Sequence, residues 1–162
     1  MVEFALVLPV LMVLILGLVS AASAWNQSQS MTHAGQVAAR FGSTVPWPSS
    51  TTDRDAWLDA IIDRSISTST GAMSTGVGGR AICVAYVDPA GAAPDKTVSR
   101  RINAAGTRTS ATTECFSDSL GTTAKRVQVV MDRSSTIEIG FHRQDVHLHR
   151  TIVYRFEADL GL

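Results

Sequence analysis

Charged side chains are almost absent from the N-terminal part of this sequence. Between Glu3 and Arg40 there is no Asp, Glu, Lys or Arg, and only His33 can titrate. In the whole chain 17% of the residues are charged and the formal net charge is zero. Because nucleic-acid binding requires a cationic face that neutralises phosphates, this composition predicts no nucleic-acid partner. The chain therefore joins a charge-free N-terminal segment to a conventional polar part.

Cysteine is also scarce. Cys83 and Cys115 are the only two, and both lie in the polar part. Their spacing alone leaves a pair of reduced, buried thiols as the alternative to a disulfide. The N-terminal segment favours export to an oxidising compartment, so we expect the two residues to form a disulfide. In the chain-entropy model, closing a loop of that size stabilises a domain by roughly 3–4 kcal/mol.

Sequence motifs of catalysis and nucleotide binding are missing. There is no G-x-S-x-G, no H-E-x-x-H and no glycine-rich phosphate loop. We therefore predict no catalytic residues and no cofactor. His142, His147 and His149, with Asp145 as a further ligand, suggest a zinc site. Solvated histidines on a polar strand face are the simpler interpretation, and the choice stays open.

One long apolar run dominates what the sequence does contain. It reads FALVLPVLMVLILGLVSAASAW, from Phe4 to Trp25. As a helix it would span roughly 33 Å, enough for the hydrocarbon core of a bilayer. Since a core helix of a soluble protein is rarely apolar on every face, we predict a membrane-spanning segment.

Two interpretations differ in whether this run is cleaved off or retained. Ala22-Ser23-Ala24 is typical of a signal-peptidase site, with removal after Ala24. Against removal, no basic residue precedes the run, which is also longer than the apolar region of a signal peptide. Helical spacing of apolar residues continues to Phe41. We favour retention and predict one helix over residues 4–42, with a kink or a first-turn break near residues 5–9 caused by Pro9.

Glu3 stands at the margin of the apolar run. A carboxylate buried in hydrocarbon is costly unless it is paired or protonated. Two interpretations remain open. Glu3 lies at the level of the lipid headgroups, or it is inserted and pairs with the positive N-terminus of a neighbouring subunit.

The two ends of the sequence resemble a known family. VEFALVLPVLMVLILGLV at residues 2–19 and Ala-Ala-Arg at residues 38–40 are similar to the TadE-like pilins, which belong to the tight-adherence subclass of type IV pili. TIVYRFE at residues 151–157 is similar to the last strand of that family, although this motif is less specific. The residues between these segments carry no family motif.

The resemblance implies a structural subunit that is not an enzyme. Glu3, Phe4 and Pro9 match the family's N-terminal pattern, and Glu3 would set the register between subunits. The implied partners are other pilin subunits, the inner-membrane pilus assembly machinery and, before assembly, the lipid bilayer. The implied location is a single pass through the inner membrane and afterwards the extracellular pilus.

Two family features bear on the type of subunit. A leader peptidase leaves the family's glutamate at the fifth position, whereas Glu3 is third, so no cleavage site is assigned to any residue. Major pilins of the subclass are far smaller than this chain. The length therefore favours a minor pilin or pseudopilin.

The polar part predicts an α+β domain. We expect a filament-core helix over residues 1–43 and an extracytoplasmic domain over residues 44–162. A second helix is expected from Asp53 to about Ser65, with Thr52 as its N-cap. The strands of a four- to five-stranded antiparallel sheet, with one face on the helices and one in water, are expected at 81–87, 98–102, 126–131, 136–141 and 145–157.

The segments between these elements are predicted to be irregular. Residues 67–79 predict a small-residue linker or an exposed loop, and residues 132–135 suit a hairpin turn. Residues 104–124 form an excursion that a disulfide would attach to the sheet. On the second helix, Asp59 and Asp63 indicate a solvated face or, as the sharper hypothesis, a paired-carboxylate site.

Two other functions remain as hypotheses. One is a membrane-anchored pilus assembly factor that does not polymerise. The other is a secreted ligand-binding module that begins after cleavage at Ala24.

Overall fold

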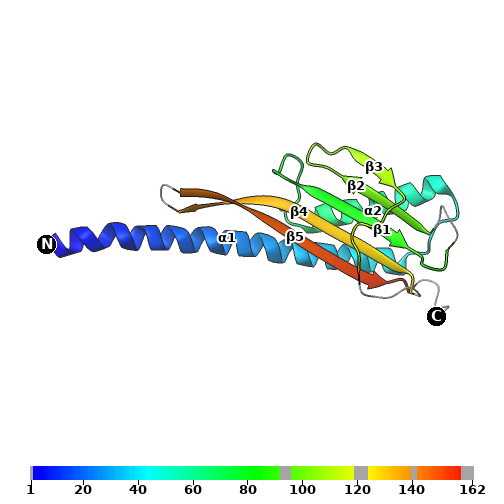
Figure 1. Cartoon of the computed structure of the whole chain (residues 1–162), viewed down its shortest axis with the longest axis horizontal. Helices are drawn as coiled ribbons and strands as arrows, with labels where there is room; N and C mark the ends of the chain where they lie inside the picture. Colours follow the sequence, from blue (N-terminus) through cyan, green and yellow to red (C-terminus); the bar gives the residue numbers. More distant parts are fainter. Residues whose placement is uncertain (1, 92–95, 119–123, 140–141, 158–162) are drawn as a thin grey trace.

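The computed structural model describes residues 2–91, 96–118, 124–139 and 142–157 of the 162-residue chain, with residues 2–6, 138, 139 and 142 described by their backbone alone. Within these ranges the chain forms two helices and five strands (Figure 1). Their bounds are α1 (Val2–Thr44), α2 (Thr51–Thr68), β1 (Ala81–Val87), β2 (Thr97–Ile102), β3 (Arg108–Ala111), β4 (Arg126–Ile139) and β5 (His142–Arg155).

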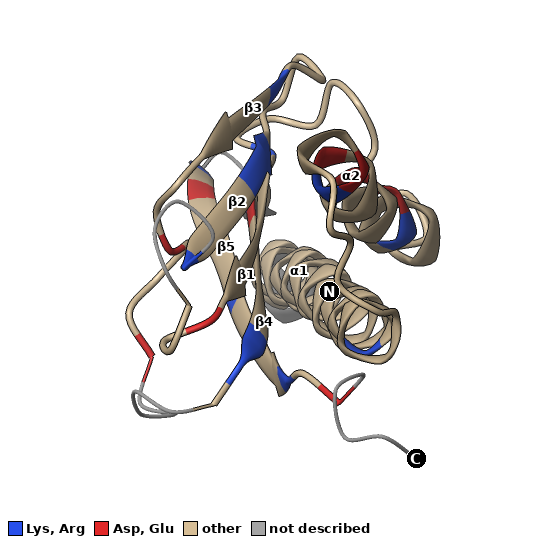
Figure 2. Cartoon of the chain, turned by 90° about the vertical axis from the view of Figure 1, so that its right-hand side faces the viewer, with Lys and Arg blue, Asp and Glu red and all other residues tan. Residues whose placement is uncertain are grey.

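The five strands make one antiparallel sheet in the order β3-β2-β1-β4-β5. β1 lies at its centre, as its unbroken apolar sequence predicted, and six of its seven residues are buried. Both helices lie on the same face of the sheet, which Figure 2 shows along the direction of α1. The fold class is therefore the predicted α+β arrangement of a long N-terminal apolar helix and an antiparallel sheet.

The hydrophobic core fills the space between the helices and the sheet. The apolar stripe predicted on α2 is entirely buried there: Trp57, Leu58, Ile61 and Ile62. It faces the core because residues three and four apart share one side of a helix. Val84, Val127, Val129 and Met131 cover the core from the sheet, and none of them is exposed.

An aromatic cluster closes the core beside the end of α1. The rings of Trp47 and Tyr86 are stacked with centroids 3.9 Å apart, and Trp57 and Phe156 meet Tyr86 edge to face at 6.2 and 5.2 Å. Trp47 stands between two prolines in the segment that ends the long helix. The cluster therefore fixes the chain where it leaves α1, because aromatic pairs of this geometry add to the stabilisation from burial.

The helix boundaries differ from the prediction in two places. α1 is helical on both sides of Pro9, so of the predicted kink or first-turn break near residues 5–9 the break does not occur, and the kink stays a prediction. A proline removes a single backbone hydrogen bond, and the turns on each side remain. In α2 the N-cap position belongs to Ser50, not Thr52. The Ser50 side chain makes no capping bond, and its carbonyl accepts from Arg54 N at 3.0 Å.

The predicted hairpin turn at residues 132–135 is wrong. β4 runs straight through these residues and pairs with β5 along its full length, from Arg126 with Arg155 to Ile139 with His142. The polar residues that suggested a turn have tertiary partners instead. Asp132 Oδ1 accepts from His149 Nδ1 at 2.5 Å, and Ser135 Oγ donates to Gln27 at 2.9 Å. The resulting hairpin projects beyond the other strands alongside α1 (Figure 1).

Two further segments differ from their predicted structure. β3 was expected to be irregular, but its four residues pair with β2 and form the edge of the sheet. The segment between α2 and β1 was expected to be a small-residue linker or an exposed loop. Instead Met73 is fully buried and Ala72 is 7% exposed, so this segment is attached to the core.

Candidate functional site: the uncovered half of the long helix

The N-terminal half of α1 is uncovered in the described structure. Its large apolar side chains from Val7 to Val19 are exposed on all sides, Leu14 by 61% and Leu18 by 71%. Fully burying one such side chain is worth about 1.5–3 kcal/mol, so this surface is strongly unfavourable in water. Of the described helices, α1 is the one long and apolar enough to cross a membrane.

The helix changes character at Ala24. From there to Ser43 one side of it is buried against the sheet and α2, and we call this side the seat. Its residues recur every three or four positions, as one helix face requires. They are mostly small: Ala24, Ser28, Met31, Ala34, Gly35, Ala38, Ala39, Gly42 and Ser43.

Two glycines allow the close approach of α1 in the seat. A methyl group added at Gly42 would lie 2.6 Å from Ile61 Cδ1 and 3.2 Å from Val127 Cγ1. At Gly35 the added methyl would collide with the Ile152 side chain, with Met131 Sδ 3.3 Å away. Interiors are close-packed, so neither position has room for a larger side chain without a shift of its neighbours.

A polar segment separates the uncovered half from most of the seat. The Trp25 side chain is 68% exposed, and Asn26 to Ser30 are all polar. Tryptophan followed by polar residues is typical of the boundary between hydrocarbon and headgroups. The hairpin contacts this segment: Ser135 donates to Gln27, and the Arg150 guanidinium donates to Ser28 Oγ. The domain is thus attached to α1 directly beyond the apolar surface.

The predicted assembly residues lie at the far end of α1. The backbone of Glu3 and Phe4 is helical, and their side chains lie outside the described residues. Pro9 is exposed within the apolar run. No role for these three residues is therefore tested by the structure, and their part in assembly stays a prediction.

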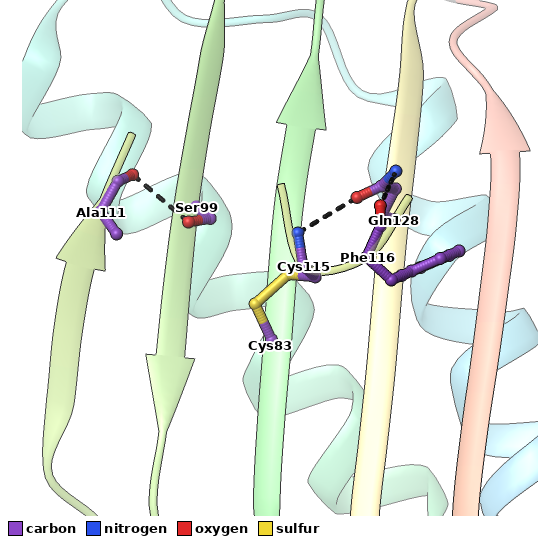
Figure 3. Close-up of a disulfide and its surroundings, with 6 residues drawn as sticks. All are labelled: Cys83, Ser99, Ala111, Cys115, Phe116 and Gln128. Atoms are coloured by element: carbon purple, nitrogen blue, oxygen red, sulfur yellow. Dashed lines mark hydrogen bonds between the residues drawn. A yellow bond between two sulfur atoms is a disulfide. The ribbon is translucent and has the colours of Figure 1, made fainter. Parts of the chain in front are cut away.

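Cys83 and Cys115 form a disulfide across a sequence separation of 32 residues, with Cα atoms 5.8 Å apart. It attaches the segment after β3 to the sheet face opposite the helices (Figure 3). Cys115 N donates to Gln128 Oε1 at 3.2 Å, and Gln128 Nε2 donates to the Phe116 carbonyl at 3.0 Å. The face predicted to be wet is therefore partly covered, and Gln128 is fully buried on it.

A buried ion pair completes that covered region. Arg126 Nε donates to Asp118 Oδ2 at 2.6 Å, and the two side chains are 6% and 5% exposed. Gln128 Nε2 donates to the same carboxylate oxygen at 2.6 Å. Charges this deeply buried must be paired and hydrogen-bonded, and here they are. The group is best described as structural support for the disulfide-bonded segment.

The carboxylates of α2 form ion pairs with the edge of the sheet. Arg100 donates to both oxygens of Asp59 at 2.9 and 3.0 Å and to Asp55 at 3.2 Å, and Arg108 donates to Asp59 and Asp63. The hydrogen bond to Asp59 raises the pKa of Arg100 above its ordinary value. In Figure 2 acidic positions are coloured red on α2, and basic positions are coloured blue on β2 and β3. The face is thus neither simply solvated nor a paired-carboxylate site.

His147 and His149 are exposed and lie on one face of β5, because they are two residues apart in a strand. Beside the bond from His149 to Asp132, His147 Nδ1 lies 3.3 Å from Ser134 Oγ. The His142 side chain lies outside the described residues. Among the residues that the structure describes, no three potential metal-binding side chains gather at one point.

Sequence reasoning missed two arginines that hold the segment between α2 and β1. Arg80 is 2% exposed and donates to the carbonyls of Met73 and Asn103 at 3.0 and 2.8 Å. Arg133 donates to the neighbouring carbonyl of Ala72 at 2.8 Å. Burial lowers the pKa of both arginines. An isolated arginine carries no sequence signal for such a role, because its acceptors are backbone groups brought near by the fold.

Comparison with known families agrees with the N-terminal resemblance. Residues 1–40 match the family described as TadE-like protein, the family that the sequence resembles. This range covers the uncovered half of α1 and most of the seat. No curated protein and no solved structure matches the chain. The match and the uncovered apolar helix together fit a pilus-associated subunit.

Proposed function

We propose that this chain, with its TadE-like N-terminal segment, is a minor pilin or pseudopilin of a tight-adherence pilus. It would be held in the inner membrane by α1 and later polymerise through the same helix for surface attachment. The role is structural and not enzymatic. In this proposal residues 1–43 are the filament-core helix and residues 44–162 the extracytoplasmic domain.

The exposure of apolar side chains from Val7 to Val19 carries the proposal. A surface apolar on all sides needs either lipid or other apolar helices around it. Leaving the bilayer is uphill unless equivalent packing replaces lipid. A bundle of α1 helices from neighbouring subunits supplies that packing, because each helix offers the same uncovered surface.

The seat supports the second half of the proposal. Beyond Ala24 one side of α1 is buried against its own sheet and α2, whereas the N-terminal half offers its whole apolar surface to neighbours. Subunits would then bundle through residues 7–23 and carry their sheets on the outside. Glu3, Phe4 and Pro9 lie at the start of this surface, where a carboxylate paired with a neighbour's N-terminus would set the axial register.

Shearing separates a polymerising subunit from a membrane-anchored assembly factor. Cells are sheared, and filaments and membranes are collected and probed for the chain. The proposal expects the chain in both fractions. Its confinement to membranes would instead identify an assembly factor. If the chain is instead found free in the medium, and its intact mass shows that it begins at Trp25, it is a secreted module and the proposal is refuted.

The register role of Glu3 is tested in the same assay. Glu3→Ala is expected to leave the chain in the membrane fraction and to remove it from sheared filaments. Asn26→Ala, at an exposed position of the same helix, is the control and should assemble normally. Normal assembly of Glu3→Ala would refute the register role and leave the rest of the proposal standing.

A further inference from the structure

A polar pocket lies beside the polar segment of α1. It is lined by residues of α1, the turn after α2 and β4: Gln27, Ser30, Thr70, Gly71, Ala72 and Arg133. None of these described residues is acidic. α2 runs antiparallel to α1, since Ser30 Oγ donates to the Ser69 carbonyl at 2.7 Å while Ile61 packs beside Gly42. The pocket is therefore on the end of the domain that faces the apolar half of α1.

Arg133 has most of its hydrogen-bonding capacity unused. Among the described residues its guanidinium makes one hydrogen bond, to Ala72, and no ion pair, and its Nε is buried without a partner. A guanidinium has five N–H donors and no acceptor. The guanidinium is half-buried and lines the pocket, so its remaining N–H groups can donate to an anion there, and hydrogen bonds to an ionised acceptor are among the strong ones.

The backbone of the pocket adds donors. Ser69 has φ −75° and Thr70 has φ +48°, the second in the left-handed region that a threonine rarely adopts. Such a change of hand turns successive N–H groups into a concavity that binds anions. The amides of Thr70 and Gly71 donate to no described backbone group. Ser30 and Thr70 also line the pocket, and their hydroxyl oxygens are 3.0 Å apart.

The position of the pocket along α1 corresponds to the depth of the lipid headgroups. Gln27 and Ser30 follow Trp25 by two and five residues, which is about 3 and 8 Å along a helix. The headgroup region adds about 5–8 Å on each side of the hydrocarbon core. If Trp25 marks the edge of the hydrocarbon, the pocket lies at the depth of lipid phosphates.

We propose that this pocket binds the phosphate of an anionic lipid headgroup and docks the domain on the bilayer before assembly. The inference rests on the proposed membrane location of α1. Arg80 is the useful contrast, because it holds the neighbouring carbonyl yet is fully buried by protein. Of these two arginines, Arg133 is the one that lines an opening from which a ligand can reach it.

Amide hydrogen exchange of the full chain in lipid nanodiscs tests the proposal. One preparation uses phosphatidylglycerol, and the other uses digalactosyldiacylglycerol, whose headgroup is uncharged and has no phosphate. We expect exchange of the 69–74 amides to be slower in phosphatidylglycerol by about fivefold or more, the lower end of typical site coupling. Exchange within β1 should be equal in the two lipids and reports an intact fold.

Variants separate the pocket from general charge attraction. Arg133→Gln should remove the protection, and Arg133→Lys, which keeps the charge, should retain part of it. Arg64→Gln is the matched control, because Arg64 is exposed in the last turns of α2 and does not line the pocket. Full protection in Arg133→Gln, or equal loss in Arg64→Gln, would overturn the proposal.

Two more outcomes locate a failure. Inorganic phosphate added to the glycolipid nanodiscs should give no comparable protection; the same protection would show a site for free phosphate and overturn lipid docking. Equal amide exchange of the wild-type chain in both lipids would refute lipid binding by the pocket. It would leave the proposed membrane location standing, because the chain has inserted into the nanodiscs. A chain that does not remain with nanodiscs would overturn this inference together with the proposed membrane location.

Discussion

The two halves of α1 share one continuous backbone but have opposite surroundings. Leu14 in the first half is 61% exposed, whereas Met31 in the second is fully buried. The first half is apolar, mostly with large side chains, and the second has mostly small residues on its buried face and mostly polar ones on the other. One helix is thus suited to lipid or sister helices at one end and to its own sheet at the other. Mutations should therefore affect membrane insertion and domain stability separately.

The largest effect is expected from charge in the first half. Leu11→Arg with Leu14→Arg should disfavour membrane insertion by about 6–8 kcal/mol, the transfer difference for two residues at the helix centre. The measurement is alkaline extraction of membranes, after which the variant should be soluble or degraded. Gln29→Arg with Gln36→Arg, at exposed positions of the second half, should remain in the membrane. Equal extraction of both variants would contradict a division between the halves.

The second prediction concerns the domain alone. Cys83→Ala with Cys115→Ala should lower the free energy of unfolding by about 3–4 kcal/mol, because a loop of 32 residues is no longer closed in the unfolded chain. Urea unfolding of the full chain in detergent, followed by the near-ultraviolet signal of the Trp47–Tyr86 cluster, measures it. Membrane retention should be unchanged. A loss of retention equal to that of the Leu11 and Leu14 variant would show that the halves are coupled.

The third prediction probes the seat. Gly35→Val should destabilise the domain by about 1–3 kcal/mol, since its side chain meets Ile152 and Met131. Gly17→Val, in the uncovered half, adds the same atoms to the same helix and should leave the urea midpoint unchanged. An equal shift for both variants would mean that helix propensity, and not packing, decides the effect.

The smallest effect is expected at the ion pairs of α2. Arg100→Gln should lower domain stability by about 1 kcal/mol and by less in 1 M salt, because the pair is partly solvated. The bond to Asp59 raises the pKa of Arg100, so its contribution is present below the unfolded pKa and is lost only as pH rises through the folded one. Unfolding between about pH 6 and 9 should therefore show a constant difference from wild type. A difference that vanishes within this range would contradict the pairing.

Several elements could be predicted because their signals are local. The apolar run, the buried stripe of α2 and the central strand β1 follow from periodicity or from unbroken hydrophobicity. Even so, the predicted strands matched the real sheet only in part. Residues 136–141 were assigned a strand of their own, whereas residues 136–139 continue β4, and the fifth strand is β3 at residues 108–111.

The misassigned turn shows why local signals failed there. Asp132 to Ser135 have turn composition, and nothing nearby in the sequence opposes a turn. Their partners are Ala72, His147, His149 and Gln27, which are distant in the chain. Pairing with β5 on both sides of these residues outweighed their local preference, as tertiary context commonly does for strands.

The sequence by itself determined that the chain has a membrane-length apolar helix, a small α+β domain and two cysteines able to join. These properties depend on composition and on spacing along one segment. Only the tertiary structure decided where the seat of α1 begins, which arginines pair with carboxylates, and that Arg133 lines an open pocket whereas Arg80 is buried. Such facts depend on which distant backbone groups become neighbours, and hydrophobic periodicity specifies a buried face without specifying what it is buried against.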